Sequence, residues 1–227
     1  QSDFGLVDGA VSAMIGVALQ EEPSLGVHHL THDITPYNTF EASYRLFQTV
    51  EYWPKGTTFV SVVDPGVGSS RKSVVALTKT GQYIVTPDNG TLSYIKKDVG
   101  IVAVREISEV ENRCSNTELS YTFHGRDVYA YTGAKLASGH ISFEEVGPEL
   151  PVDKILEFPV VETIIEENLV RGAIDILDVR FGSLWTSITR DDFYALEPNF
   201  GDRFEVTIFN NDMLVYQNQV TYGKSFA

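Results

Sequence analysis

The chain of 227 residues lacks most features that mark membrane-spanning or disulfide-bonded proteins. Its only cysteine is Cys114, which excludes an intramolecular disulfide framework and suits a reducing cytoplasm. No run of about 18 apolar residues is present to span a bilayer, and the first four residues do not read as the start of a signal peptide. We therefore expect a cytoplasmic protein with no membrane role.

Positive charge is also scarce. The chain has 17 Lys and Arg residues against 31 Asp and Glu residues, a net charge of −14. Such a chain repels the phosphates of nucleic acid, so nucleic acid is not an expected partner, whereas a cationic ligand is favoured. A composition of 43% hydrophobic and 21% charged residues is typical of a globular protein with a buried core.

The first part of the chain alternates helix-like and strand-like segments. Apolar residues recur at helical spacing after Asp8, and a second helical stretch covers residues 40–52. Apolar, β-branched runs at 57–63 and 74–77 predict strands, and a turn follows each run. This alternation predicts an α/β fold, with an N-terminal three-layer α/β/α domain over residues 1–155.

The second part of the chain has a different character. Prolines punctuate a linker from Pro148 onward, and strand-like runs dominate after it. We therefore predict a smaller, mostly β domain over residues 160–227. Because no terminal helix or closing strand is visible, we expect the natural chain to continue past Ala227. The predicted strands of this domain are 173–179, 184–188, 204–209 and 213–220.

A glycine-rich loop follows the predicted strand at 57–63. It carries the carboxylate of Asp64 and the guanidinium of Arg71. In α/β sheets, ligands bind at the carboxyl ends of strands, so this loop is a candidate site. The alternative is a tight turn, because Asp-Pro-Gly is ordinary turn chemistry. The loop lacks the Gly-Lys-Ser/Thr ending that a phosphate-binding loop requires.

Residues 123–127, Phe-His-Gly-Arg-Asp, lie just before a predicted helix. A histidine at this position can orient water or a substrate, although loop histidines are often structural. Arg126 and Asp127 can equally pair with each other or cap the helix. Residues 87–90, Pro-Asp-Asn-Gly, predict a chain reversal after a short strand.

The densest group of possible metal ligands is His28, His29, His32 and Asp33. In an extended segment this spacing is too long for easy chelation, and no second ligand group follows it. We therefore predict a strand leading into a turn at Pro36 and no metal site.

Residues 178–186 combine the carboxylate of Asp178 with two aromatic side chains around a glycine. Aromatic rings beside a polar group can form a pocket for a flat base, and the same residues can also form ordinary β-domain core. Shortly after this segment, the acidic pair Asp191 and Asp192 predicts the start of a helix.

Five motifs occur together in one order along the chain: Asp-Phe-Gly, Asp-Pro-Gly-Val-Gly-Ser, Pro-Asp-Asn-Gly, Phe-His-Gly-Arg-Asp and Phe-Gly-x-Leu-Trp-Thr. In this order they resemble the S-adenosylmethionine (SAM) hydroxide adenosyltransferases, relatives of the nucleophilic fluorinases and chlorinases. The resemblance runs from Ser2 to about Ile188 and continues more loosely to the end.

The resemblance implies a two-domain subunit, α/β and then β-barrel-like. It also implies a homotrimer with each active site between the first domain of one subunit and the second domain of its neighbour. The implied reaction is hydrolysis of SAM to adenosine and methionine with no cofactor and no metal. Asp64, Arg71 and His124 match the residues that hold water for in-line attack on the ribose C5′.

The resemblance also implies how the substrate is bound. Asp3 matches the ligand of the ribose hydroxyls. The family commonly has asparagine where this chain has Ser183 and Ser187, so a side-chain amide contact to adenine or methionine is expected to be weaker here. The positions that match the lining of the adenosine and methionine ends are Phe123, Asp178, Phe181, Ser183 and Trp185.

Three different functions compete with hydrolysis. A halogenase is disfavoured because the halogenases lack a carboxylate at the position of Asp64 and carry an aromatic residue in place of His124. An anion beside a bound halide in a dry pocket is repelled. The second competing function is a non-catalytic nucleoside-binding or SAM-binding protein, and the third is a structural trimer with a vestigial pocket.

Overall fold

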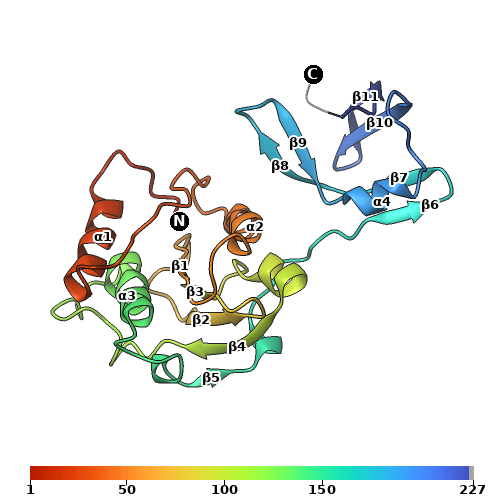
Figure 1. Cartoon of the computed structure of the whole chain (residues 1–227). Coiled ribbons are helices and arrows are strands. Elements are labelled where there is room, and N and C mark those ends of the chain that lie inside the picture. The colour runs from red at the N-terminus through yellow and green to blue at the C-terminus, as the bar shows by residue number, and fades with distance from the viewer. Residues whose placement is uncertain (225–227) are drawn as a thin grey trace. The chain divides into compact units, whose positions relative to one another are not determined.

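The structure is a computed structural model that describes residues 1–224. Its backbone divides into two compact units, Gln1–Pro159 and Val160–Ala227. The first unit is a mixed α/β fold, and the second consists mainly of β-hairpins (Figure 1).

One five-stranded mixed sheet organises the first unit, with the strand order β1-β3-β2-β4-β5. β1 and β3 are parallel, and the other neighbouring strands are antiparallel. A tight turn at Gly81, where φ is 90°, joins β2 to β3, because glycine adopts positive φ at little cost. The strands are β1 (Thr58–Val60), β2 (Ser73–Thr78), β3 (Tyr83–Pro87), β4 (Ile101–Glu106) and β5 (Glu149–Leu150).

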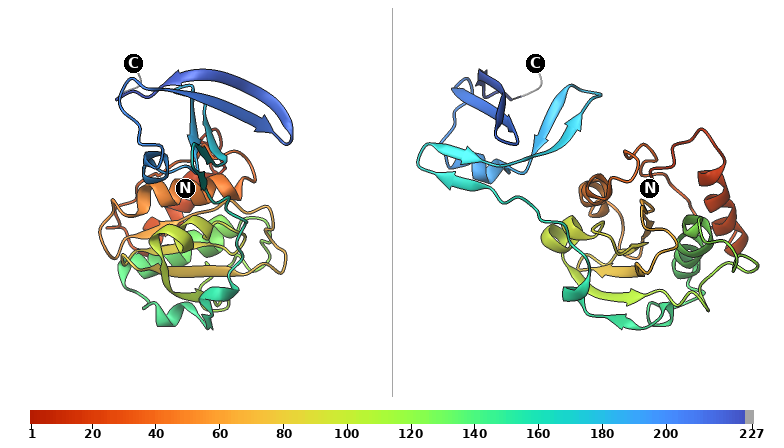
Figure 2. Two further views of the ribbon diagram at one scale, coloured as in Figure 1. Left: turned by 90° about the vertical axis from the view of Figure 1, so that its right-hand side faces the viewer. Right: turned by 180° about the vertical axis from the view of Figure 1, so that it is seen from behind.

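Helices cover both faces of this sheet. On one face, Val74 of β2 packs in a cluster with Leu46 of α2; on the other, Val75 packs with Met14 of α1 and Val128 of η2. Adjacent residues of a strand point to opposite faces, so a strand buried on both faces is continuously apolar. Figure 2 shows the sheet with α1 and α3 on one side and α2 on the other. The three-layer α/β/α prediction agrees with this packing. The helical segments are α1 (Ala10–Glu21), α2 (Thr39–Val50), η1 (Ile95–Val99), η2 (Gly125–Ala130), α3 (Tyr131–Ser138), η3 (Glu144–Val146) and η4 (Val152–Lys154).

The two predicted helices of the N-terminal part are confirmed, with slightly different ends. Asn38 Oδ1 accepts a hydrogen bond from the Glu41 N–H at 3.0 Å and so caps α2. For α1 the N-cap position is Gly9, and the predicted cap Asp8 accepts from the Ala10 N–H at 2.8 Å.

The strand predicted around the histidine cluster is wrong, because residues 28–33 form a loop. The Ser2 N–H donates to the Thr31 carbonyl at 3.0 Å, but no ladder continues from this bond in the described chain. His29 Nδ1 lies 2.9 Å from His32 Nε2. A strand would place these two residues, three apart, on opposite faces, so this contact requires a bent backbone.

The second unit contains three antiparallel hairpins, each forming its own two-stranded sheet. A short helix, α4 (Arg190–Tyr194), begins at a capping box formed by Thr189 and Asp192, close to the predicted start at Asp191. The strands are β6 (Ile164–Glu166), β7 (Leu169–Arg171), β8 (Ile174–Asp178), β9 (Ser183–Thr186), β10 (Arg203–Asn210) and β11 (Met213–Thr221).

The described residues of the second unit do not form the closed barrel that the resemblance implies. A barrel needs hydrogen bonds that run from each strand to the next around the whole sheet. Here each strand pairs only with the other strand of its hairpin. Large apolar side chains such as Phe209 and Leu214 remain exposed on these open hairpins.

Candidate active site

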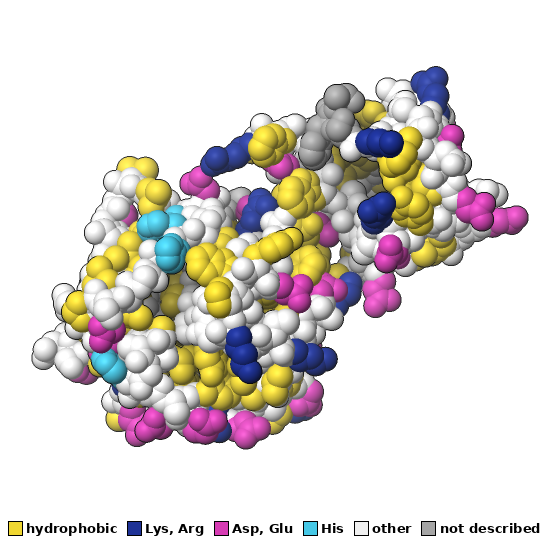
Figure 3. Space-filling view, viewed as in Figure 1, with side chains coloured by type: hydrophobic (Ala, Val, Ile, Leu, Met, Phe, Trp, Pro, Cys, Tyr) yellow, Lys and Arg dark blue, Asp and Glu magenta, His cyan; other side chains and the backbone are white. Residues whose placement is uncertain are grey.

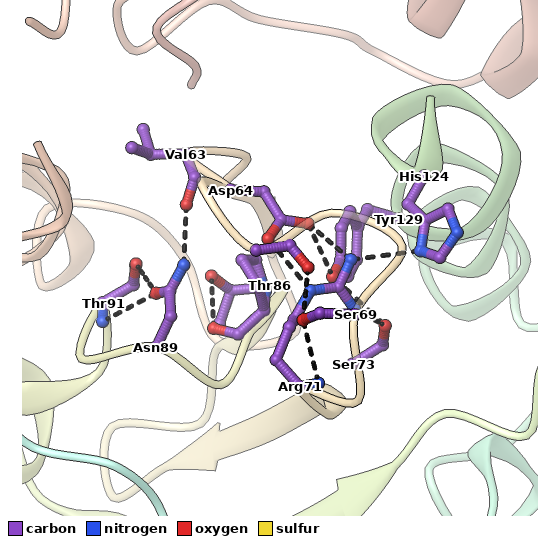
Figure 4. A network of polar contacts seen from close by, with 12 residues as sticks. Val63, Asp64, Ser69, Arg71, Ser73, Thr86, Asn89, Thr91, His124 and Tyr129 are labelled. Atoms are coloured by element: carbon purple, nitrogen blue, oxygen red, sulfur yellow. Dashed lines mark hydrogen bonds and ion pairs between the residues drawn. The ribbon is translucent and has the colours of Figure 1, made fainter. Parts of the chain in front are cut away.

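The sheet places Asp64 at the end of the segment that begins with β1. Val62 forms a parallel bridge with Ser2, and the turn at residues 65–68 then reverses the chain. Asn89, in the turn after β3, donates from Nδ2 to the Val63 carbonyl at 2.8 Å and so ties down the residue before Asp64 (Figure 4). The Pro-Asp-Asn-Gly turn therefore supports this loop, a role that its sequence alone did not indicate.

Asp64 and Arg71 form a bidentate ion pair inside the first unit. Arg71 Nε donates to Asp64 Oδ1 at 2.9 Å, and a terminal nitrogen donates to Oδ2 at 2.5 Å. The side chains are only 6% and 9% exposed, respectively. Burial opposes the charged form of Arg71, but the hydrogen bonds to Asp64 and the electrostatic influence of Tyr129, Asp64 and Glu109 together outweigh it and raise the pKa of the guanidinium. The guanidinium therefore keeps its charge in a largely water-free setting.

His124 completes the cluster from the start of η2. Its Nδ1 lies 3.1 Å from a terminal nitrogen of Arg71, although 53 residues separate the two in the sequence. Figure 4 shows the side chains of Asp64, Arg71 and His124 pointing toward one another. Burial lowers the pKa of His124; Glu109 opposes this shift, and the two neighbouring arginines add to it. The structure thus brings the three predicted residues together around a neutral imidazole.

Two residues that the sequence did not indicate also belong to this network. Arg71 donates to Ser73 Oγ at 2.8 Å, and the Tyr129 hydroxyl lies 3.1 Å from the same oxygen and 3.5 Å from Asp64 Oδ2. Burial and the nearby Asp64 carboxylate raise the pKa of Tyr129, so its hydroxyl stays protonated. Neither residue lies in a motif, so no local signal marked them.

A cavity of about 390 Å³ opens beside this cluster. Asp64, His124, Asp3 and Phe123 all line it. Asp3 Oδ2 accepts a hydrogen bond from the N–H of Tyr37 at 2.8 Å, which holds the carboxylate at the cavity wall. The volume falls in the range of about 300–1,000 Å³ that is typical of small-molecule sites. The first unit alone therefore contains a ligand-sized cavity with two carboxylates and an imidazole.

The remaining predicted binding residues lie on the β8–β9 hairpin of the second unit. Asp178 pairs in register with Ser183, and Asp178 Oδ2 accepts from Trp185 Nε1 at 3.2 Å. Phe181 lies at the tip of the hairpin and is 82% exposed. The structure thus gathers these four residues on one hairpin, and their contact with a ligand stays a prediction.

The histidines of the cluster at residues 28–32 do not line the cavity beside Asp64. His32 Nδ1 lies 2.7 Å from Ser2 Oγ, and burial lowers the pKa of His32 to about 4. In residues 1–224, no group of three or more His, Cys, Asp and Glu side chains is arranged to hold a metal ion.

A second cavity lies between α1, α3 and the edge of β1. Its lining is largely apolar, with Met14, Phe59 and Trp53 among the contributors; its ionisable side chains are His28, His29 and His32, and it includes no Asp, Glu, Lys or Arg side chain. The buried Asp64–Arg71 pair lies beside the other cavity, so we take the cavity lined by Asp64 and His124 as the candidate site.

The surface agrees with the acidic composition. Figure 3 shows acidic side chains along the lower edge of the first unit in that view.

Within the described part of the chain, no helix is both long and apolar enough to cross a bilayer.

The loop that carries Asp64 depends on Gly68, whose φ is 75°. An added Cβ would lie 2.8 Å from the Tyr121 carbonyl oxygen, so Gly68→Ala combines backbone strain with a clash. We expect it to lower the free energy of unfolding by about 1–3 kcal/mol. Gly139→Ala is the matched control, because Gly139 has the same φ of 75° and open space around its Cβ position. Thermal unfolding should show a clearly larger loss for Gly68→Ala; equal losses would contradict the predicted clash.

The fold and the site together define a mixed α/β protein with a buried carboxylate, guanidinium and imidazole beside a small-molecule cavity. Residues 1–147 match the SAM hydroxide adenosyltransferase N-terminal domain. The chain therefore belongs to the SAM hydroxide adenosyltransferase family, which also relates it to the fluorinases.

Several related proteins agree with this assignment, and a solved structure shares the fold. The chain is 33% identical to an (R)-S-adenosyl-L-methionine hydrolase of Methanocaldococcus jannaschii, over 84% of this chain and 66% of that protein. It is 35% identical to the hydrolase of the same name from Thermus thermophilus, over 83% and 73% of the two chains. A fluorinase of Actinopolyspora mzabensis is 26% identical over 91% and 76%. A crystal structure of an uncharacterized protein from Thermotoga maritima superposes with a TM-score of 0.90 at 32% identity, over 99% and 82%. The chain thus spans about two thirds of the length of the first of these hydrolases.

Proposed function

We propose that this protein hydrolyses SAM to adenosine and methionine. The observation that carries the proposal is the buried Asp64–Arg71 pair, which lies against His124 at the wall of a ligand-sized cavity. The two hydrolases at 33% and 35% identity support the same reaction.

In the proposed reaction, Asp64 acts on a water molecule at the cavity wall. Water is a weak nucleophile with a pKa of about 15.7, so a carboxylate that accepts its proton and a cation that stabilises hydroxide lower the barrier. The water oxygen bonds to the ribose C5′ as the C5′–S bond breaks. The electron pair of that bond goes to the sulfonium sulfur, and methionine leaves uncharged at sulfur. Because the sulfonium already activates the leaving group, positioning of the oxygen is the main contribution of the protein.

Substrate binding in this proposal uses both units. Asp3 accepts hydrogen bonds from the ribose hydroxyls, and Phe123 lines the same cavity. Asp178, Phe181, Ser183 and Trp185 contact the adenosine and methionine ends. In the proposed homotrimer this hairpin comes from a neighbouring subunit, and the 82% exposure of Phe181 leaves its ring free for such a contact.

The experiment that tests the function is incubation of the protein with SAM, followed by chromatography of the products. In halide-free buffer we expect adenosine and methionine in equal amounts. Added chloride or fluoride should give no halogenated nucleoside, because the Asp64 carboxylate repels an anion at the position of the water. Tight binding of SAM or adenosine without turnover would replace the proposal with a non-catalytic binding protein, and a halogenated product would replace it with a halogenase.

A further inference from the structure

The imidazole of His124 lies between two guanidinium groups. Its Nδ1 is 3.1 Å from a terminal nitrogen of Arg71, and its Nε2 is 3.1 Å from a terminal nitrogen of Arg113. A guanidinium only donates hydrogen bonds, and a neutral imidazole has one lone pair and one N–H. Only one of the two contacts can therefore be a hydrogen bond. A protonated ring would direct an N–H at both cations, so this arrangement requires the neutral ring.

Arg113 is held in place independently of the Asp64–Arg71 pair. It lies in the loop between β4 and η2, where it donates to the carbonyls of Thr117 and Ser120, each at 3.1 Å. The nitrogen that faces His124 also donates to Glu109 Oε2 at 2.8 Å. The Arg113 side chain is only 11% exposed. The loop thus fixes one guanidinium N–H toward Nε2.

The other ring nitrogen, Nδ1, lies beside the guanidinium that is paired with Asp64. His124 lines the cavity that Asp64 also lines, and Nδ1 is the nitrogen near Arg71. Glu109 Oε1 lies 3.9 Å from Nδ1, which favours a proton on that nitrogen. With the proton on Nδ1, the Nδ1–H and the Arg71 N–H form two adjacent donors. An oxygen that accepts from both would satisfy them, and hydroxide does so best because it is anionic.

We infer that Arg113 is a positioning residue: it donates to Nε2 of His124 and so holds the neutral tautomer that carries its proton on Nδ1. Under the proposed function, on which this last step rests, His124 then donates a hydrogen bond to the attacking oxygen. The lone pair on Nε2 is already occupied, so Asp64 is the group that takes the proton from water.

Four charged groups face His124, and each shifts the pKa of the imidazole in a direction that can be tested. Arg71 and Arg113 lower the pKa of the imidazole, Glu109 raises it, and Asp64 also raises it. Removal of the Arg113 charge should therefore raise the pKa of His124, and removal of the Glu109 charge should lower it. If Arg113 and Glu109 only held the loop together, removing their charges would not shift the pKa of His124 in opposite directions.

The first test is an NMR titration of the substrate-free protein labelled with ¹⁵N in its histidine rings, with His124→Gln used to assign the signal. We expect the wild-type His124 to carry its proton on Nδ1. Arg113→Gln should raise its pKa by about one unit, Arg113→Lys should restore most of the shift, and Glu109→Gln should move it the other way. A proton on Nε2 in the wild type, or an unchanged pKa in both charge-removing variants, would overturn the inference. If Arg113→Gln does not fold, the tautomer and the Glu109→Gln shift still decide it.

The second test is the pH profile of kcat/KM for the same proteins. Activity should require neutral His124, so the acidic limb should move to higher pH in Arg113→Gln and to lower pH in Glu109→Gln. The NMR titration needs no turnover. A wild-type protein that binds SAM but does not cleave it would therefore remove the proposed function and leave the Arg113 inference to be judged on the tautomer.

Discussion

Asp64→Asn is expected to lower the turnover of SAM by about 10²–10⁴-fold, because asparagine keeps the shape of the side chain but cannot accept a proton from water. The amide oxygen can still accept from Arg71, so the loop should keep its path. Binding of substrate depends on other residues of the cavity and should change little. The loss should therefore be in kcat, with a nearly constant KM.

The measurement is the rate of adenosine formation across SAM concentrations for the wild type and the variant. Asp153→Asn is the control, since Asp153 is 74% exposed and lies far along the chain from the cavity loops. It removes the same charge from the protein and should leave turnover unchanged. Wild-type turnover in Asp64→Asn would show that another group accepts the proton.

Arg71→Met is expected to abolish turnover and to destabilise the fold. Methionine fills similar space but leaves the Asp64 carboxylate, which is 6% exposed, without its cation. Breaking a buried ion pair on one side costs about 3–5 kcal/mol, because the remaining charge stays buried and uncompensated. The unfolding transition should therefore shift to lower temperature by several degrees.

The double variant Asp64→Asn/Arg71→Met separates the two effects. It removes both charges, so thermal unfolding should recover much of the stability that the single variant loses. Turnover should stay absent, because neither the proton acceptor nor the cation is present. A double variant no more stable than Arg71→Met would show that the loss comes from packing and not from the unpaired carboxylate.

Local chemistry made several elements of this fold predictable. Asn38 at the start of α2 and the apolar spacing after it predict a helix, because both act within one or two turns of backbone. The β-branched runs that became β2, β10 and β11 were predictable for the same reason. The segment around His29 was not, because its loop depends on contacts with the N-terminal residues.

The residues of the candidate site also fall into two groups, those that the sequence indicated and those that only the structure revealed. The motif order indicated Asp64, Arg71 and His124 through family resemblance, while their residue types alone were equally compatible with a simple turn. Ser73, Tyr129 and Arg113 carry no motif and became visible only through their contacts with this cluster.

By itself, the sequence predicted helices α1 and α2, strands β1 and β2, and the family, and the family resemblance indicated the three central polar residues, since each of these depends on short-range patterns. Only the tertiary structure decided that His124 meets Arg71 across 53 residues, that two guanidinium groups face one imidazole, and that Asp64 is buried. These properties depend on which strands and loops the sheet brings together, and pKa shifts and tautomers follow from those long-range neighbours.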